Sequence, residues 1–102
     1  AIKSAKVAIL GFTFKENCPD IRNTKVVDIY HTLKEYTDNI TICDPWADTD
    51  LVKKEYDIEV INHLPDNELF DVAILAVAHN EFSNIDIKSL MKALKVLVFL
   101  MA

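Results

Sequence analysis

Short apolar segments alternate along the chain with longer segments in which apolar residues recur every three or four positions. Continuous apolar runs rich in β-branched residues are typical of strands buried on both faces, whereas the wider spacing is typical of amphipathic helices. The predicted strands are Lys6–Phe12, Asn39–Cys43, Ile58–Ile61, Asp71–Ala78 and Lys95–Leu100. The predicted helices are Lys25–Tyr36, Asp48–Tyr56 and Asp86–Leu94.

The connection between the first strand and the first helix is the longest one before a helix. It is the polar loop Thr13–Thr24, of about twelve residues, and connections longer than the usual two to six are often functional. Asn23 or Thr24 stands where the helix needs an N-cap, because both side chains can accept a hydrogen bond from a free N–H group. The second strand is stopped by Asp44-Pro45.

Strands that alternate with helices and are apolar throughout predict an α/β fold with a parallel sheet covered by helices. Right-handed crossovers and short connections favour five strands in the order 3-2-1-4-5, a Rossmann-like three-layer α/β/α sandwich. The 102 residues are expected to form one domain, residues 1–102. The chain begins almost on a strand and stops at the end of another, so we expect a domain of a larger protein.

Charge and hydropathy narrow the possible partners. Eleven basic against sixteen acidic residues give a net charge of −5, which disfavours nonspecific binding to nucleic acid or to anionic membranes. The longest apolar runs are far shorter than the roughly 18 residues that a membrane span needs. Cys18 and Cys43 are expected as reduced thiols, which favours a cytoplasmic protein. His31 and His63 lack metal-ligand spacing, so no metal site is expected.

Gly11 is the single glycine of the chain. The G-x-G-x-x-G fingerprint of dinucleotide-binding folds and the P-loop both need several glycines, so neither motif is present. A nucleotide bound by this chain would have to be held in another way.

In an open α/β sheet, ligands bind beyond the carboxyl ends of the strands. The loop after the first strand places Lys15 and Arg22 on either side of Asp20 and leads into a helix N-terminus, an arrangement that suits an anion. Alternatively, Lys15 is solvated and Arg22 pairs with Asp20 to hold the loop. At the same edge, Asp44 is either a turn residue or a ribose-binding acid, and His79 either begins a turn or touches a ligand.

The segment from Gly11 to Arg22 resembles the signature G-x-x-F-K-x-N-T-D-D-x-R, which opens the C-terminal domain of the UDP-glucose/GDP-mannose dehydrogenase family. The residues in register are Gly11, Phe14, Lys15, Asn17, Asp20 and Arg22. Cys18-Pro19 stands where Thr-Asp is common, and this variant resembles the branch that acts on UDP-N-acetylhexosamines in capsule and O-antigen pathways. The resemblance extends through Asp44-Pro45 and Ala76–His79, and so covers nearly the whole chain.

The resemblance implies the UDP-binding C-terminal domain of an enzyme that oxidises the C6 hydroxyl of a nucleotide sugar to a carboxylate in two NAD-dependent steps. It places Phe14 and Lys15 on the UDP-sugar substrate and Arg22 on the cofactor phosphates or at a domain-closing contact, with Asp20 orienting Arg22 or capping the loop. The family binds NAD mainly through an N-terminal domain and forms oligomers largely through a middle domain. Those two domains would be the partners of this chain within one homo-oligomeric polypeptide.

The family's catalytic cysteine lies before this domain, so no catalytic residue is expected in the chain and the isolated domain is expected to be inactive. Cys18 stands where the family usually has threonine, and Cys43 is expected as a small buried apolar group. The alternative is a free-standing nucleotide-binding or signalling module of flavodoxin-like topology. A response-regulator-like module needs a phosphoacceptor aspartate after the third strand, where this chain has Asn62-His63.

Overall fold

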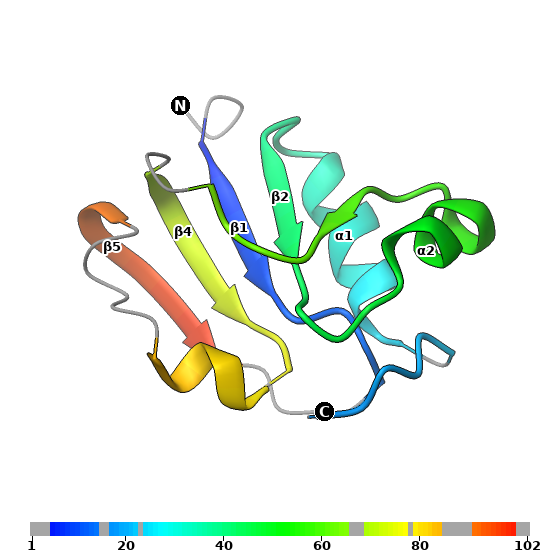
Figure 1. Cartoon of the computed structure of the whole chain (residues 1–102). Helices are drawn as coiled ribbons and strands as arrows, with labels where there is room; N and C mark the ends of the chain where they lie inside the picture. The colour runs from blue at the N-terminus through cyan, green and yellow to red at the C-terminus, as the bar shows by residue number, and fades with distance from the viewer. Residues whose placement is uncertain are drawn as a thin grey trace.

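In the computed structural model, a parallel sheet crosses the molecule and two α-helices pack against it (Figure 1). The structure describes residues 5–14, 17–22, 24–65, 69–77, 79–84 and 91–99. The strands are β1 (Val7–Leu10), β2 (Ile40–Cys43), β3 (Val60–Ile61), β4 (Phe70–Leu75) and β5 (Met91–Phe99). The helices are α1 (Val26–Lys34), α2 (Thr49–Tyr56) and the 3-10 helix η2 (Asn80–Asn84).

The strands lie in the order β3-β2-β1-β4-β5, and every neighbouring pair is parallel. The predicted α/β class with a parallel sheet is therefore confirmed, as is the order 3-2-1-4 of the first four strands. β1 lies in the middle, where it pairs with β2 from Val7 to Leu10 on one side and with β4 on the other. The whole of β1 is buried, as its apolar sequence predicts.

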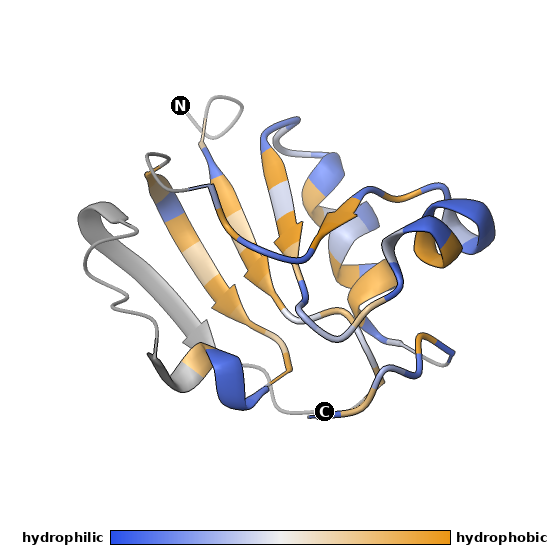
Figure 2. Cartoon of the chain, viewed as in Figure 1, coloured by the Kyte–Doolittle hydropathy of each residue, from blue (hydrophilic) through white to orange (hydrophobic). Residues whose placement is uncertain are grey.

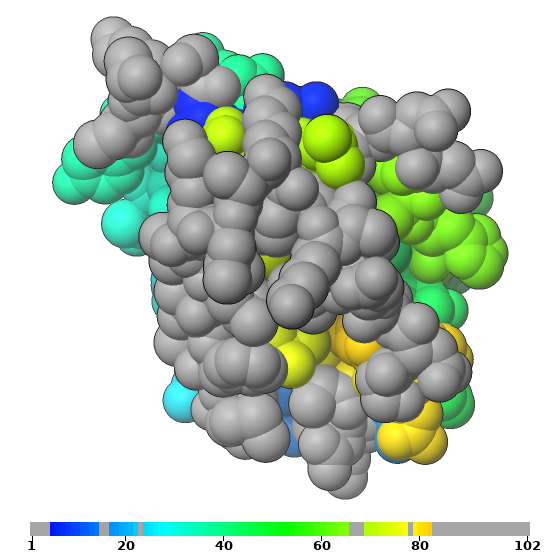
Figure 3. All heavy atoms as spheres, turned by 90° about the vertical axis from the view of Figure 1, so that its left-hand side faces the viewer, coloured from blue at the N-terminus to red at the C-terminus, as the bar shows by residue number. Residues whose placement is uncertain are grey.

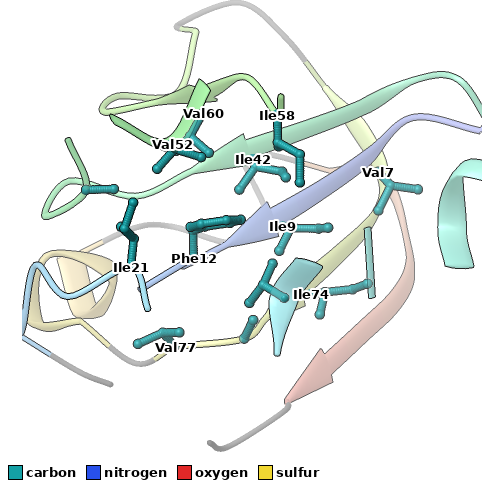
Figure 4. Packing of buried hydrophobic residues seen from close by; sticks show 13 residues of the cluster. Val7, Ile9, Phe12, Ile21, Ile42, Val52, Ile58, Val60, Ile74 and Val77 are labelled. Carbon is teal, nitrogen blue, oxygen red and sulfur yellow. The ribbon is translucent and has the colours of Figure 1, made fainter. Parts of the chain in front are cut away.

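Side chains of the central strands alternate between two apolar clusters. The larger cluster joins Ile9 of β1, Ile42 of β2 and Ile74 of β4 to Val26 of α1 and Val52 of α2. Figure 4 shows Ile9, Ile42, Ile74 and Val52 among the packed side chains of this cluster. Figure 2 shows hydrophobic residues concentrated along β1, β2 and β4, and hydrophilic residues on much of α1 and α2. α1 and α2 therefore cover one face of the sheet.

The second cluster lies on the opposite face. It contains Leu10 of β1, Cys43 of β2 and Phe82 of η2, with Leu64 and Leu75 packed against it. In the described part of the chain this face is covered by η2 and the segment after β3. The third layer of the expected sandwich stays a prediction, because residues 85–90 lie outside the described residues.

The predicted helix Asp86–Leu94 is wrong at its C-terminal end, because β5 begins at Met91 rather than at Lys95. The sequence MKALKVLVF places apolar residues at both helical and strand spacing, and short apolar segments cannot be assigned from periodicity alone. β4 supplies strand partners to Met91 and to the four residues from Val96 to Phe99. Its register to β4 shifts between Phe70 and Val72, where the pairing is irregular.

None of the helices in the described ranges is long and apolar enough to cross a membrane.

Candidate functional site

Three connections meet at the carboxyl end of the sheet. The arrowheads of β1, β2 and β4 point to the same end of the molecule, where the loop after β1 and η2 also lie (Figure 1). Viewed from the side of β5, η2 lies at the opposite end from the start of β4 (Figure 3). The prediction that Asp44 and His79 lie at the same edge of the sheet is confirmed. His79 Nε2 lies 2.9 Å from Asp44 Oδ2.

Asp44 is fully buried and organises this end of the sheet. Its Oδ2 accepts hydrogen bonds from the backbone N–H groups of Phe12 (2.6 Å) and Thr13 (2.9 Å) and lies 2.9 Å from Nε2 of His79. Its Oδ1 accepts from the N–H of Trp46 at 2.8 Å. A buried carboxylate needs such donors to replace water. The turn role is therefore observed, and the buried carboxylate presents no exposed face to a ribose.

His79 is also buried, and its two ring nitrogens have different partners. Nδ1 accepts a hydrogen bond from the backbone N–H of Asn17 at 2.8 Å. Nε2 lies 2.9 Å from Asp44 Oδ2 and 2.9 Å from Thr13 Oγ1. Because an amide N–H only donates, Nδ1 must be unprotonated, and the ring proton must be on Nε2. This geometry requires a neutral imidazole, and a solvent-facing ligand contact for His79 is not observed.

Aromatic contacts enclose the histidine. The Trp46 ring stacks on the His79 ring with centroids 6.1 Å apart and an interplanar angle of 23°, and the Phe82 centroid lies 5.7 Å from it. The indole Nε1 of Trp46 donates to Glu81 Oε1 at 2.8 Å. Trp46 therefore links the turn after β2 to η2 while 37% of its surface stays exposed.

The loop after β1 is tied down at several points. The N–H of Phe14 donates to the carbonyl of Asp20 at 2.7 Å, and the hydroxyl of Tyr56 donates to the carbonyl of Ile21 at 2.7 Å. The expected N-cap at Thr24 is wrong by one position, because the N-cap of α1 is Lys25, whose side chain makes no capping hydrogen bond, and the other candidate, Asn23, lies outside the described residues. The Thr24 hydroxyl still donates to the carbonyl of Phe12 and accepts from the N–H of Val26, the first residue of the helix. Phe14 is 45% exposed and is not part of the core.

Arg22 and Asp20 form the ion pair that the sequence offered as an alternative. Arg22 Nε lies 3.0 Å from Asp20 Oδ1, and Arg22 Nη2 lies 3.2 Å from Oδ2. Asp20 also accepts from the backbone N–H of Arg22, so it both caps the turn and orients the guanidinium. The hydrogen bonds to Arg22 lower the pKa of Asp20, and those to Asp20 raise the pKa of Arg22.

Of the three site residues expected from the sequence, two can be placed. Phe14 and Arg22 both lie on the loop after β1, and the Arg22 side chain is 84% exposed. Lys15 lies outside the described residues. Thr13 and Asn17, which bond His79, were not singled out as network residues. The available signal was that a polar residue follows each of the three strands that end at this edge.

The two cysteines have different environments. Cys43 is buried, and burial, followed by the negative charge of Asp44, raises the pKa of its thiol to about 11. Cys18 is half-buried on the loop after β1. The expectation that Cys43 is a buried apolar group is confirmed. Such a thiol is a poor nucleophile at neutral pH, because the thiolate is the reactive form.

We expect iodoacetamide to alkylate Cys18 at least about 100-fold faster than Cys43 in the folded chain at pH 8. A pKa of about 11, against 9.0 for an ordinary thiol, leaves Cys43 about 100-fold less thiolate, and burial limits access further. Mass spectrometry of the two peptides over time measures both rates. In urea both cysteines should react at similar rates. Equal rates in the folded chain would contradict the burial of Cys43.

In the described ranges, no three His, Cys, Asp or Glu side chains lie close enough together to hold a metal ion. The arrangement at the carboxyl edge is instead a buried polar network that fixes the backbone of a partly exposed loop. That loop presents an aromatic ring and a guanidinium at the surface.

Comparisons with known proteins agree on one family. The family model for the UDP-glucose/GDP-mannose dehydrogenase family, UDP binding domain, matches residues 8–100. The chain is 46% identical over 91 residues to a UDP-N-acetyl-D-glucosamine 6-dehydrogenase of Pseudomonas aeruginosa, covering 89% of this chain and 21% of that protein. It is 43% identical over 81 residues to the Salmonella typhi protein of the same name, covering 79% of this chain and 19% of that protein.

A protein of Staphylococcus aureus called CapL is also 43% identical over 81 residues, covering 79% of this chain and 19% of that protein. Among solved structures, the UDP-D-ManNAc dehydrogenase from Pyrococcus horikoshii superposes with a TM-score of 0.73. The match covers 96% of this chain and 22% of that one at 19% identity, which supports the fold alone. The chain therefore spans about a fifth of the length of the curated relatives it matches.

Proposed function

Because this chain belongs to the UDP-glucose/GDP-mannose dehydrogenase family as its UDP-binding domain, we propose that it binds the UDP-sugar substrate of a larger NAD-dependent 6-dehydrogenase. The parent enzyme oxidises the C6 hydroxyl of the sugar to a carboxylate, for a surface-polysaccharide precursor. NAD binds mainly to an N-terminal domain of the same polypeptide, and a middle domain forms the homo-oligomer. The share of the relatives that this chain spans supports a parent with further domains.

We propose a UDP-N-acetylhexosamine as the substrate. The F-K-E-N-C-P-D-x-R form of the loop supports this choice, as does the similarity to the two UDP-N-acetyl-D-glucosamine 6-dehydrogenases named above. The oxidation uses a cysteine that this chain does not supply. Cys43, with its pKa raised to about 11, is unsuited to that role. The isolated chain is therefore a binding domain without activity of its own.

The observation that carries the proposal is the exposed Phe14 on a loop whose backbone is held at Phe12, Thr13 and Asn17. Hydrogen bonds hold Phe12 and Thr13 on one side and Asn17 on the other, while Phe14 stays 45% exposed. A preorganised loop loses less conformational entropy when a ligand binds. Phe14 then packs against the nucleotide sugar, and Lys15, next in sequence, supplies a positive charge to its oxygens.

For Arg22 we propose a contact with the cofactor phosphates or a contact that closes the domains. Its ion pair with Asp20 is exposed, and exposed pairs add little to stability. A phosphate can therefore replace Asp20 as the partner of the guanidinium at low energetic cost. Arginine suits this exchange, because its planar fork binds carboxylates and phosphates in the same bidentate way.

We expect Lys15→Ala to weaken UDP binding by about tenfold or more, because a hydrogen bond to a charged group contributes about 1.5–3 kcal/mol. Calorimetric titration of the 102-residue chain at low salt, with UDP, UDP-N-acetylglucosamine and NAD, measures this. The wild-type chain should bind both uridine nucleotides weakly and give no heat with NAD.

Lys54→Ala is the matched control, because Lys54 is an exposed lysine on α2. This variant should bind UDP as the wild type does. Equal loss in the two lysine variants would assign the effect to net charge and reject a specific role for Lys15. A wild-type chain that binds NAD but neither uridine nucleotide would reject the proposed function.

A further inference from the structure

In the buried network at the carboxyl edge, the two ring nitrogens of His79 have different partners, and the proposed function assigns no role to this arrangement. Building on that function, we propose that His79 positions the ligand-binding loop, as a neutral imidazole whose Nδ1 accepts the backbone N–H of Asn17. The Nε2–H group of the same ring is held by Asp44 and Thr13. His79 thus acts on the ligand through the loop and makes no contact with it.

Asn17 is held on two sides by the segment that follows β4. Its N–H donates to His79 Nδ1 at 2.8 Å, and its side-chain Oδ1 accepts from the N–H of Asn80 at 2.9 Å. Its φ of 54° lies in the left-handed region, which asparagine tolerates better than most residues. Two specific contacts therefore hold a backbone conformation that would otherwise be unfavourable, three positions after Phe14.

Asp44 fixes which ring nitrogen is free to accept. Its carboxylate is already surrounded by three backbone N–H donors and is aimed at Nε2. A proton on Nε2 satisfies that oxygen and leaves Nδ1 with a lone pair toward Asn17. The opposite tautomer would bring two donors together at Asn17 and two acceptors together at Asp44.

The roles of the two ring nitrogens can be tested separately by substituting His79 with asparagine or glutamine. In His79→Asn, the side-chain oxygen can take the place of Nδ1 and accept from Asn17, whereas the group that faced Asp44 is lost. In His79→Gln, the amide nitrogen can take the place of Nε2 and donate to Asp44, whereas the acceptor for Asn17 is lost. A role in filling space alone would make the two variants alike or favour the larger glutamine.

The test combines three measurements on the 102-residue chain. Nitrogen-15 spectra of the wild-type imidazoles should show His79 as the Nε2–H tautomer at neutral pH. The Asn17 amide should be protected from hydrogen exchange in the wild type and in His79→Asn, and should lose at least about tenfold of that protection in His79→Gln. UDP affinity should follow the same order, with His79→Gln the weaker binder by about fivefold or more. His31→Gln, on the exposed side of α1, is the control and should match the wild type.

A proton on Nδ1, or a charged His79 ring, would overturn the proposal without any variant being made. Equal protection of Asn17 in the asparagine and glutamine variants would also overturn it. If the wild type binds no UDP while the exchange data follow the expected order, the proposed function fails and the positioning of the loop by His79 stands. If UDP binds equally to both variants although protection differs, the loop contact exists but does not position the ligand, and the proposal is rejected.

Discussion

Asp44→Ala is expected to lower the free energy of unfolding by about 3–5 kcal/mol. The carboxylate is fully buried and receives the N–H groups of Phe12, Thr13 and Trp46 together with Nε2 of His79. Leaving one buried donor unsatisfied costs about 1–3 kcal/mol, and alanine leaves several. Water that enters the space can accept hydrogen bonds from some of these N–H groups and so reduces the loss of stability. A chain of this size has a total stability of about 5–15 kcal/mol, so the variant is expected to be marginal.

Urea unfolding followed by circular dichroism measures this difference, with two other variants for comparison. Asp44→Asn keeps the shape and can keep an acceptor on the Oδ2 side, but it turns an NH₂ group toward Trp46, so an intermediate loss is expected. Asp48→Ala removes an exposed carboxylate that accepts from the N–H of Leu51 at the start of α2, and should cost about 1 kcal/mol. If Asp44→Ala costs no more than Asp48→Ala, the buried network does not stabilise the fold.

The strand order of the sheet could be predicted from the sequence because the strands are marked by local patterns that recur along the chain. β1, β2 and β4 are apolar runs flanked by polar segments, and the rule that crossovers are right-handed then predicts their neighbours. The same local signals failed at Met91–Leu94, which joined β5 instead of a helix. Met91 pairs with Phe70 of β4 and regular pairing resumes at Val96, and such contacts join segments far apart in the sequence.

The sequence predicted where the candidate site lies, but not which of its side chains contact each other. Asp44 and His79 were expected at the carboxyl edge, because each follows a parallel strand. That they bond each other, and that His79 reaches Asn17, depends on how the chain turns as it leaves β1 and β4. Their separations of 35 and 62 positions carry no periodic signal. The ion pair of Arg22 and Asp20, only two positions apart, was within reach of sequence reasoning and is present.

Gly11→Ala is expected to destabilise the chain by roughly 3–5 kcal/mol. A Cβ at this position would lie 2.6 Å from Val77 Cβ, 2.7 Å from Val77 N and 2.9 Å from Val77 Cα. The φ of 106° is also strained for any residue with a side chain. Strain of this kind costs about 1–3 kcal/mol, and forcing extra atoms into a packed interior adds about 1–3 kcal/mol more. Urea unfolding of the variant beside the wild type measures the loss.

The double variant Gly11→Ala, Val77→Ala separates backbone contact from side-chain contact. Two of the three atoms that the new Cβ meets belong to the backbone, and alanine keeps the third, so trimming Val77 removes none of them. The double variant should therefore be no more stable than Gly11→Ala alone. Recovery of most of the lost stability would mean that the outer methyl groups of Val77 make the contact.

The expected behaviour of Gly11 divides the signature loop into two parts with different physical roles. Gly11 lets the chain leave β1 against the backbone of Val77, whose N–H donates to the carbonyl of Leu10 at 3.2 Å, so its loss should weaken UDP binding only through the lower stability of the folded domain. Lys15→Ala should instead reduce binding while the urea midpoint stays near that of the wild type. If Gly11→Ala kept its stability and lost only binding, the glycine would serve the ligand, and its close approach to Val77 would not be what requires it.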